Sequence, residues 1–179
     1  MVGAVVRSVS AWGRALQGLP VVRDGRWAVG GSASLALRGL PIDPRDIDLL
    51  ADDMAVAQLV DGLQGAIVND ETPWDRGDVR ALRRVLAVVH GVEVEILVGV
   101  EAIGPSGDVV VATPNLDHVD RVVLNGRRVP VLPLSTMRVL LEATGSWERA
   151  AMVREAIGRG DARGRELGTR GGRSDGRRE

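Results

Sequence analysis

Two aspartates separated by one residue, Asp46 and Asp48, are the side chains whose type and spacing most directly suggest chemistry. Alternate side chains of a β-strand project from the same face, so the two carboxylates would lie together while Ile47 is buried on the other face. Carboxylates held that close repel each other unless a cation lies between them. The alternative is structural: Asp46 pairs with Arg45 or Arg38, and Asp48 is an exposed polar residue. The pair indicates either a cation site or two surface acids.

The composition restricts the kind of cation. The chain has no cysteine and only two histidines, which excludes disulfides and thiolate chemistry and leaves too few histidines for a zinc site. Any metal must therefore be held by carboxylates. Oxygen ligands favour Mg²⁺ or Mn²⁺ over zinc or copper.

A glycine turn precedes the aspartates. Gly30 and Gly31 follow the apolar segment 26–29, and Ser32 opens a predicted helix over 32–39. Glycines let the backbone approach a ligand, and a helix N-terminus offers free N–H groups and the positive end of its dipole to an anion. Ser32 can either cap the helix or donate its hydroxyl to a phosphate oxygen. Such turns also precede helices in folds that bind nothing there, so the turn alone is weak evidence.

A third acid is available further along the chain. The predicted strand 92–100 places Glu93 and Glu95 on one face. If this strand neighbours the aspartate strand, either glutamate could complete a metal site.

The elements that must position these residues alternate between strands and helices, which predicts an α/β (α+β) fold with a mixed sheet flanked by helices. The predicted strands are 26–29, 45–52, 82–89, 92–100, 119–124 and 127–132. The predicted helices are 1–19 with Ser8 or Ser10 at its start, 32–39, Asp52 or Asp53 to Gly65, 134–143 and 147–157. His90-Gly91 and Asn125-Gly126 predict two-residue hairpin turns, and 72–78 a polar loop.

The length of 179 residues suits one compact unit. We divide it into a core with a leading helix at 1–133, a short helical extension at 134–158, and a Gly/Arg-rich tail at 159–179 that is too poor in apolar residues to fold. No segment has the length and apolarity of a membrane span or a signal peptide, so we expect a cytoplasmic protein with no membrane partner. A net charge of −1 gives no overall footprint of nucleic-acid binding.

Taken together, Gly31-Ser32, Asp46-Ile47-Asp48 and an acid on a later strand resemble, in order, the hallmark of the nucleotidyltransferase superfamily. That superfamily includes DNA polymerase β, the CCA-adding enzymes, antibiotic-modifying enzymes and small members of toxin–antitoxin systems. The resemblance covers about residues 25–157, including the segment 131–134, which is similar to the one that follows the catalytic core in the smaller members. It implies a nucleotidyltransferase-like mixed sheet flanked by helices.

The resemblance also implies an activity, the transfer of a nucleoside monophosphate from a nucleoside triphosphate such as ATP to an acceptor hydroxyl. The family's hydrophobic-acid-hydrophobic order favours Glu95 over Glu93 as the third acid. The implied catalytic residues, which would also hold Mg²⁺ or Mn²⁺, are Asp46, Asp48 and Glu95. The implied nucleotide-binding residues are Gly30, Gly31, Ser32 and Arg38.

The chain departs from the family pattern at several points. The third acid is Glu rather than the usual Asp, the loop from Ser32 to Asp46 is somewhat long, and no lysine exists to contact the nucleotide, which leaves that role to Arg138 or Arg149. The acceptor stays open between a small molecule, RNA such as a transfer RNA end, and a partner protein. The alternatives are a non-catalytic module, acting as a toxin–antitoxin partner or nucleotide-binding regulator, and a small α/β protein whose acids are surface groups.

Overall fold

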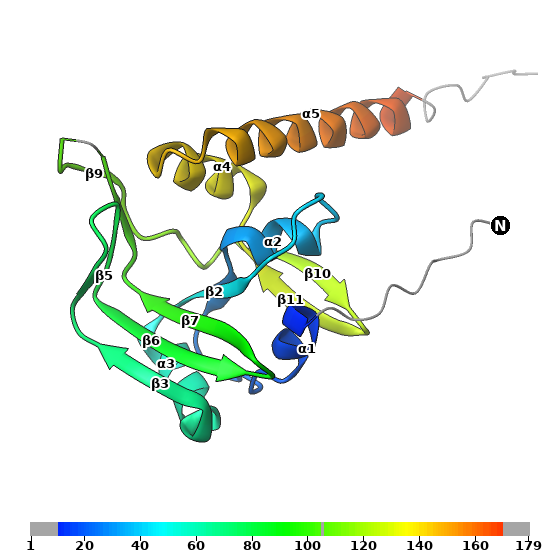
Figure 1. Ribbon diagram of the computed structural model, residues 1–179. Helices are drawn as coiled ribbons and strands as arrows, with labels where there is room; N and C mark the ends of the chain where they lie inside the picture. Colours follow the sequence, from blue (N-terminus) through cyan, green and yellow to red (C-terminus); the bar gives the residue numbers. More distant parts are fainter. Residues whose placement is uncertain (1–10, 105, 170–179) are drawn as a thin grey trace, which may run out of the picture.

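The computed structural model describes residues 11–104 and 106–169, with side chains described as far as residue 159 (Figure 1). The helices are α1 (Ala11–Gln17), α2 (Gly31–Leu37), α3 (Asp53–Gly62), a short 3₁₀ helix η1 (Gln64–Ala66), α4 (Leu134–Ala143) and α5 (Trp147–Thr169). No helix of this part of the chain is both long and apolar enough to cross a membrane.

A seven-stranded mixed sheet forms the centre of the described fold. Its strands, in spatial order, are β10 (Asp120–Leu124), β11 (Arg127–Val131), β1 (Trp27–Val29), β2 (Asp46–Ala51), β7 (Val92–Val98), β6 (Arg83–Val89) and β3 (Ile67–Glu71). A four-stranded sheet lies beside it, in the order β4 (Trp74–Asp75), β5 (Val79–Ala81), β8 (Glu101–Ile103) and β9 (Val109–Val111).

The register of the central strands determines which acids meet. Strands β2 and β7 run parallel, with Asp46 opposite Glu93 and Asp48 opposite Glu95. Strand β1 lies on the other side of β2 and places Val29, the last residue before the glycine turn, opposite Leu49. The glycine turn and the acidic residues therefore lie on adjacent strands.

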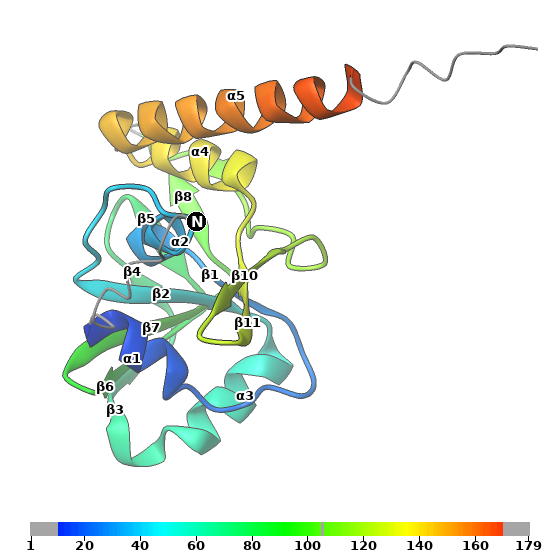
Figure 2. The same cartoon turned by 90° about the vertical axis from the view of Figure 1, so that its right-hand side faces the viewer.

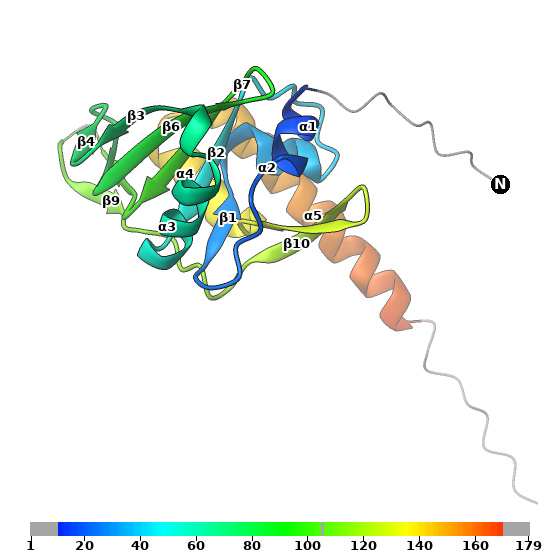
Figure 3. The same cartoon turned by 90° about the horizontal axis from the view of Figure 1, so that it is seen from below.

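The two faces of the large sheet carry different layers. Alternate residues such as Ile47 and Leu49 of β2 are fully buried in a cluster with Leu16 of α1 and Leu59 of α3. The other face contributes residues such as Leu50 to a second cluster, which includes side chains of α2, α4 and α5. Figures 2 and 3 show α1 and α3 on one side of the sheet and α4 and α5 on the other. Because side chains alternate along β2, Asp46 and Asp48 share the face that α4 and α5 cover.

The α/β (α+β) prediction of a mixed sheet flanked by helices is confirmed, and so are both hairpin turns. His90 (φ 50°) with Gly91 (φ 77°), and Asn125 (φ 48°) with Gly126 (φ 81°), place two consecutive residues at positive φ, as the tight turn between twisted strands requires. Asp52 caps α3, since its side chain accepts a hydrogen bond from the backbone N–H of Ala55.

Other predictions need correction. Helix α3 ends at Gly62 rather than Gly65, and β3, β4, β5, β8 and β9 were not predicted because these strands are short or largely polar and show little alternation. Helix α5 continues past the predicted boundary at residue 158 to Thr169, and the Ala, Arg and Glu residues of this segment are good helix formers. The predicted helix start at Ser8 or Ser10, and the predicted tail from residue 170 onwards, lie outside the described residues.

Candidate active site

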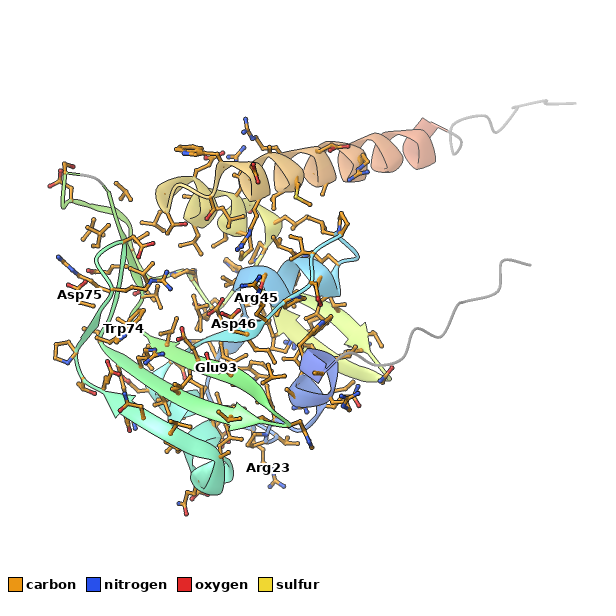
Figure 4. The ribbon with its side chains drawn as sticks, in the orientation of Figure 1. Arg23, Arg45, Asp46, Trp74, Asp75 and Glu93 are labelled. Atoms are coloured by element: carbon orange, nitrogen blue, oxygen red, sulfur yellow. The ribbon has the colours of Figure 1, made fainter. Side chains whose placement is uncertain are left out.

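A cavity of about 280 Å³ lies between the acidic face of the sheet and helices α4 and α5. Its sheet side carries Asp46 and Asp48 from β2 and Glu95 from β7, and the start of α2 adds Gly31 and Ser32. Figure 4 shows Asp46 on the central sheet and Trp74 toward the smaller sheet, with α4 above both. The structure thus brings together most of the residues that the sequence singled out.

The glycine turn is fitted closely to Asp48. Gly30 donates its backbone N–H to the carbonyl oxygen of Asp48 at 2.8 Å. Gly31 has φ +52°, and a Cβ added there would lie 1.8 Å from Oδ2 of Asp48. A larger residue would therefore both strain the backbone and displace the carboxylate.

The start of α2 differs from the capping prediction. The helix begins at Gly31, and its N-cap residue is Gly30, which has an extended backbone. No side-chain hydrogen bond caps this helix. Ser32 lies inside the first turn, so it is not the cap, and it lines the cavity instead. Its hydroxyl can thus serve a ligand.

Asp48 is the most perturbed acid of the cavity. Its pKa is raised from 3.8 to about 7, chiefly by burial and also by the negative charges of Asp46 and Glu95. The positive charges of Arg76 and Arg149 act in the opposite direction. This carboxylate is therefore costly to ionise without an added cation, which a divalent metal ion would supply.

The two candidate third acids occupy different environments. Glu95 lines the cavity with 17% of its side chain exposed, whereas Glu93 is exposed and is not part of the lining. Arg84 donates to a single oxygen of Glu95, Oε1, from Nε at 3.1 Å and from Nη2 at 2.5 Å. The geometry thus favours Glu95 as the acid of the cavity, but with a guanidinium already bound to it.

Arg38 does not line the cavity. Its Nη1 donates to Oγ of Ser34 at 2.8 Å, and its Nη2 donates to the carbonyl oxygen of Leu132 at 2.5 Å and to Asp120 at 2.9 Å. These bonds join α2 to the end of β11, and they pair Arg38 with Asp120 instead of Asp46. The contact of Arg38 with a nucleotide stays a prediction.

Two arginines face the acids. Of the two arginines expected to contact the nucleotide, Arg149 of α5 lines the cavity. Arg138 lies outside the cavity, with its Nε 3.9 Å from Oε1 of Glu142. Arg76, in the loop between β4 and β5, also lines the cavity, with its guanidinium 5.9 Å from the ring centre of Trp74. Sequence reasoning missed Arg76 because a residue in a polar loop carries no periodic pattern.

The residues present fit a single metal ion. Asp46 and Asp48 project from the same face beside the glycine turn, and carboxylate oxygens suit Mg²⁺ or Mn²⁺. Among the described side chains, in residues 11–104 and 106–159, no three His, Cys, Asp or Glu residues are grouped closely enough to hold a metal ion. Glu95, bound to Arg84, would have to move to become a third ligand.

Comparison with known proteins supports the fold. No protein-family model and no curated protein matches the chain. Among solved structures, it is similar to the crystal structure of a putative nucleotidyltransferase from Thermotoga maritima, with a TM-score of 0.61 and 21% sequence identity. The fold is nucleotidyltransferase-like. The similarity covers 76% of this chain and 84% of that one, so it spans most of both proteins.

Proposed function

We propose that the protein is a metal-dependent nucleotidyltransferase that moves a nucleoside monophosphate from a nucleoside triphosphate to an acceptor hydroxyl and releases pyrophosphate. The observation that carries this proposal is the close fit of Gly31 against Asp48 within one cavity that also contains Asp46. A backbone turn suited to phosphate beside carboxylates suited to a metal supports this assignment. The Thermotoga maritima neighbour is in agreement with this assignment.

In this proposal Asp46 and Asp48 hold the metal ion. A bound Mg²⁺ or Mn²⁺ would neutralise phosphate charge and lower the pKa of the acceptor hydroxyl. Ser32 and the backbone N–H of Gly31, which line the cavity, orient the phosphates. Arg149 and Arg76 face the acids across the cavity and stabilise the negative charge of the triphosphate.

The acceptor is a small molecule, RNA or a partner protein. Apolar side chains of the sheet and of α4, including Leu97, Met137 and Leu141, line the rest of the cavity. A cavity of about 280 Å³ with an apolar portion supports a small acceptor over a polynucleotide, which would need a basic track.

A specific observation favours a second candidate, a non-catalytic nucleotide-binding module of a toxin–antitoxin pair or a regulator. Arg84 already neutralises Glu95, and a neutralised third acid would weaken catalysis more than nucleotide binding.

One experiment separates the two functions. The protein is incubated with each α-labelled nucleoside triphosphate, Mg²⁺ and a cell extract, and label is followed into small molecules, RNA and protein. Transfer by the wild type and not by Asp46→Asn supports the transferase. Magnesium-dependent triphosphate binding without transfer supports the module, and equal transfer by both proteins contradicts the metal site.

A further inference from the structure

Arg84 is a largely buried arginine that does not line the cavity but forms an ion pair with Glu95, one of its acids. It lies on β6, opposite Leu97 of β7, and reaches diagonally to the carboxylate of Glu95. Only 14% of its side chain is exposed. The ion pair is therefore shielded from solvent. Charges in such a shielded position interact more strongly than charges at the surface.

Two further groups hold the same guanidinium. Nη1 of Arg84 donates to Glu71 of β3 at 3.3 Å, and the guanidinium carbon lies 5.2 Å from the ring centre of Trp74. Such a contact with an aromatic face stabilises a cation. Arg84 could therefore release Glu95 and keep two of its three partners.

We propose that Arg84 is a positioning residue that holds Glu95 away from the metal site until a metal-bound triphosphate enters. This inference rests on the proposed function. A free Glu95 beside Asp46 and Asp48 would add a third negative charge to the cavity and draw in a divalent cation without nucleotide. Arg84 offsets part of that charge, so it lowers the affinity for the metal alone and makes metal binding depend on the nucleotide.

The test is the affinity of the full chain for Mn²⁺ without nucleotide, measured by electron paramagnetic resonance of free Mn²⁺. Arg84→Met removes the cation and keeps the length of the stem, so we expect Mn²⁺ to bind about tenfold more tightly. The matched control is Arg83→Met on the same strand, whose ion pair with Asp70 lies outside the cavity and whose loss leaves the affinity unchanged.

Two other variants test the route of the effect. Glu71→Gln, at the sheet edge, leaves Arg84 with Glu95 as its one carboxylate partner among the described side chains, so Mn²⁺ should bind about threefold more weakly. In the Glu95→Gln background, Arg84→Met should change the affinity less than twofold, because the effect acts through Glu95.

The outcomes separate this inference from the proposed function. If Asp48→Asn loses Mn²⁺ while Arg84→Met binds it as the wild type does, the metal site stands and the role of Arg84 is wrong. If Asp48→Asn and the wild type bind Mn²⁺ equally, the proposed metal site itself fails. Absence of binding by both the wild type and Arg84→Met overturns the inference, whereas binding by Arg84→Met alone supports it.

Discussion

Replacing Asp48 with Asn should stabilise the metal-free protein at neutral and alkaline pH. Burial and two neighbouring acids raise the pKa of Asp48 from 3.8 to about 7, so the folded protein resists its ionisation. The resulting destabilisation is absent below about pH 4, grows as the pH rises, and is complete above about pH 7. A shift of about three pKa units corresponds to an upper bound of about 4 kcal/mol. Because the cavity opens to water, we expect about 2 kcal/mol.

The assay is urea unfolding in the presence of a chelator, at about pH 5 and about pH 8. Asp48→Asn should exceed the wild type in free energy of unfolding, and by more at the higher pH, since Asn keeps the shape of the side chain and removes its charge. The control is Asp70→Asn. Arg83 lowers the pKa of Asp70, so this variant should be slightly less stable than the wild type. The reasoning is refuted if Asp48→Asn is less stable than the wild type at pH 8, or if its advantage does not change with pH.

Three further predictions concern contacts made by Gly31, Arg149 and Arg127. Gly31→Ala should lose label transfer and about 1–3 kcal/mol of unfolding free energy in urea, because its Cβ would collide with Asp48; unchanged activity would contradict this. Arg149→Met should weaken triphosphate binding about tenfold by calorimetry at unchanged melting temperature, and equal affinity would remove Arg149 from the site. Arg127 donates to four backbone carbonyls at the end of α1 and beyond, so Arg127→Met should cost about 2 kcal/mol in urea unfolding, whereas the exposed Arg128→Met should cost little.

Much of the site could be predicted from local patterns. Period-two alternation placed Asp46 and Asp48 on one face, and the hairpin turns followed from Asn-Gly and His-Gly dipeptides. These features depend on backbone geometry within a few residues. Local backbone geometry does not distinguish Glu93 from Glu95, because both side chains lie on the same face of the strand. Only the approach of α2, α4 and α5 makes the position of Glu95 enclosed and leaves that of Glu93 exposed.

Contacts between distant segments were beyond the sequence patterns. Arg84 reaches Glu95 because β6 and β7 pair in one register, and Arg76 reaches the cavity because the β4–β5 loop folds over it. Arginines in a polar loop or on a β-strand have the same local pattern whether they face solvent or an acid. The cap of α2 was misplaced for a related reason: Gly30 is fixed by its bond to Asp48, which is a tertiary contact.

The central claim is that a metal ion and a triphosphate bind together at the glycine turn and the two aspartates. A crystal structure with Mn²⁺ and a non-hydrolysable triphosphate, using the anomalous signal of manganese, tests it most directly. We predict a manganese peak between the carboxylates of Asp46 and Asp48, with phosphate oxygens at Gly31 and Ser32. Manganese bound elsewhere on the protein, or triphosphate density outside this cavity, would contradict the account.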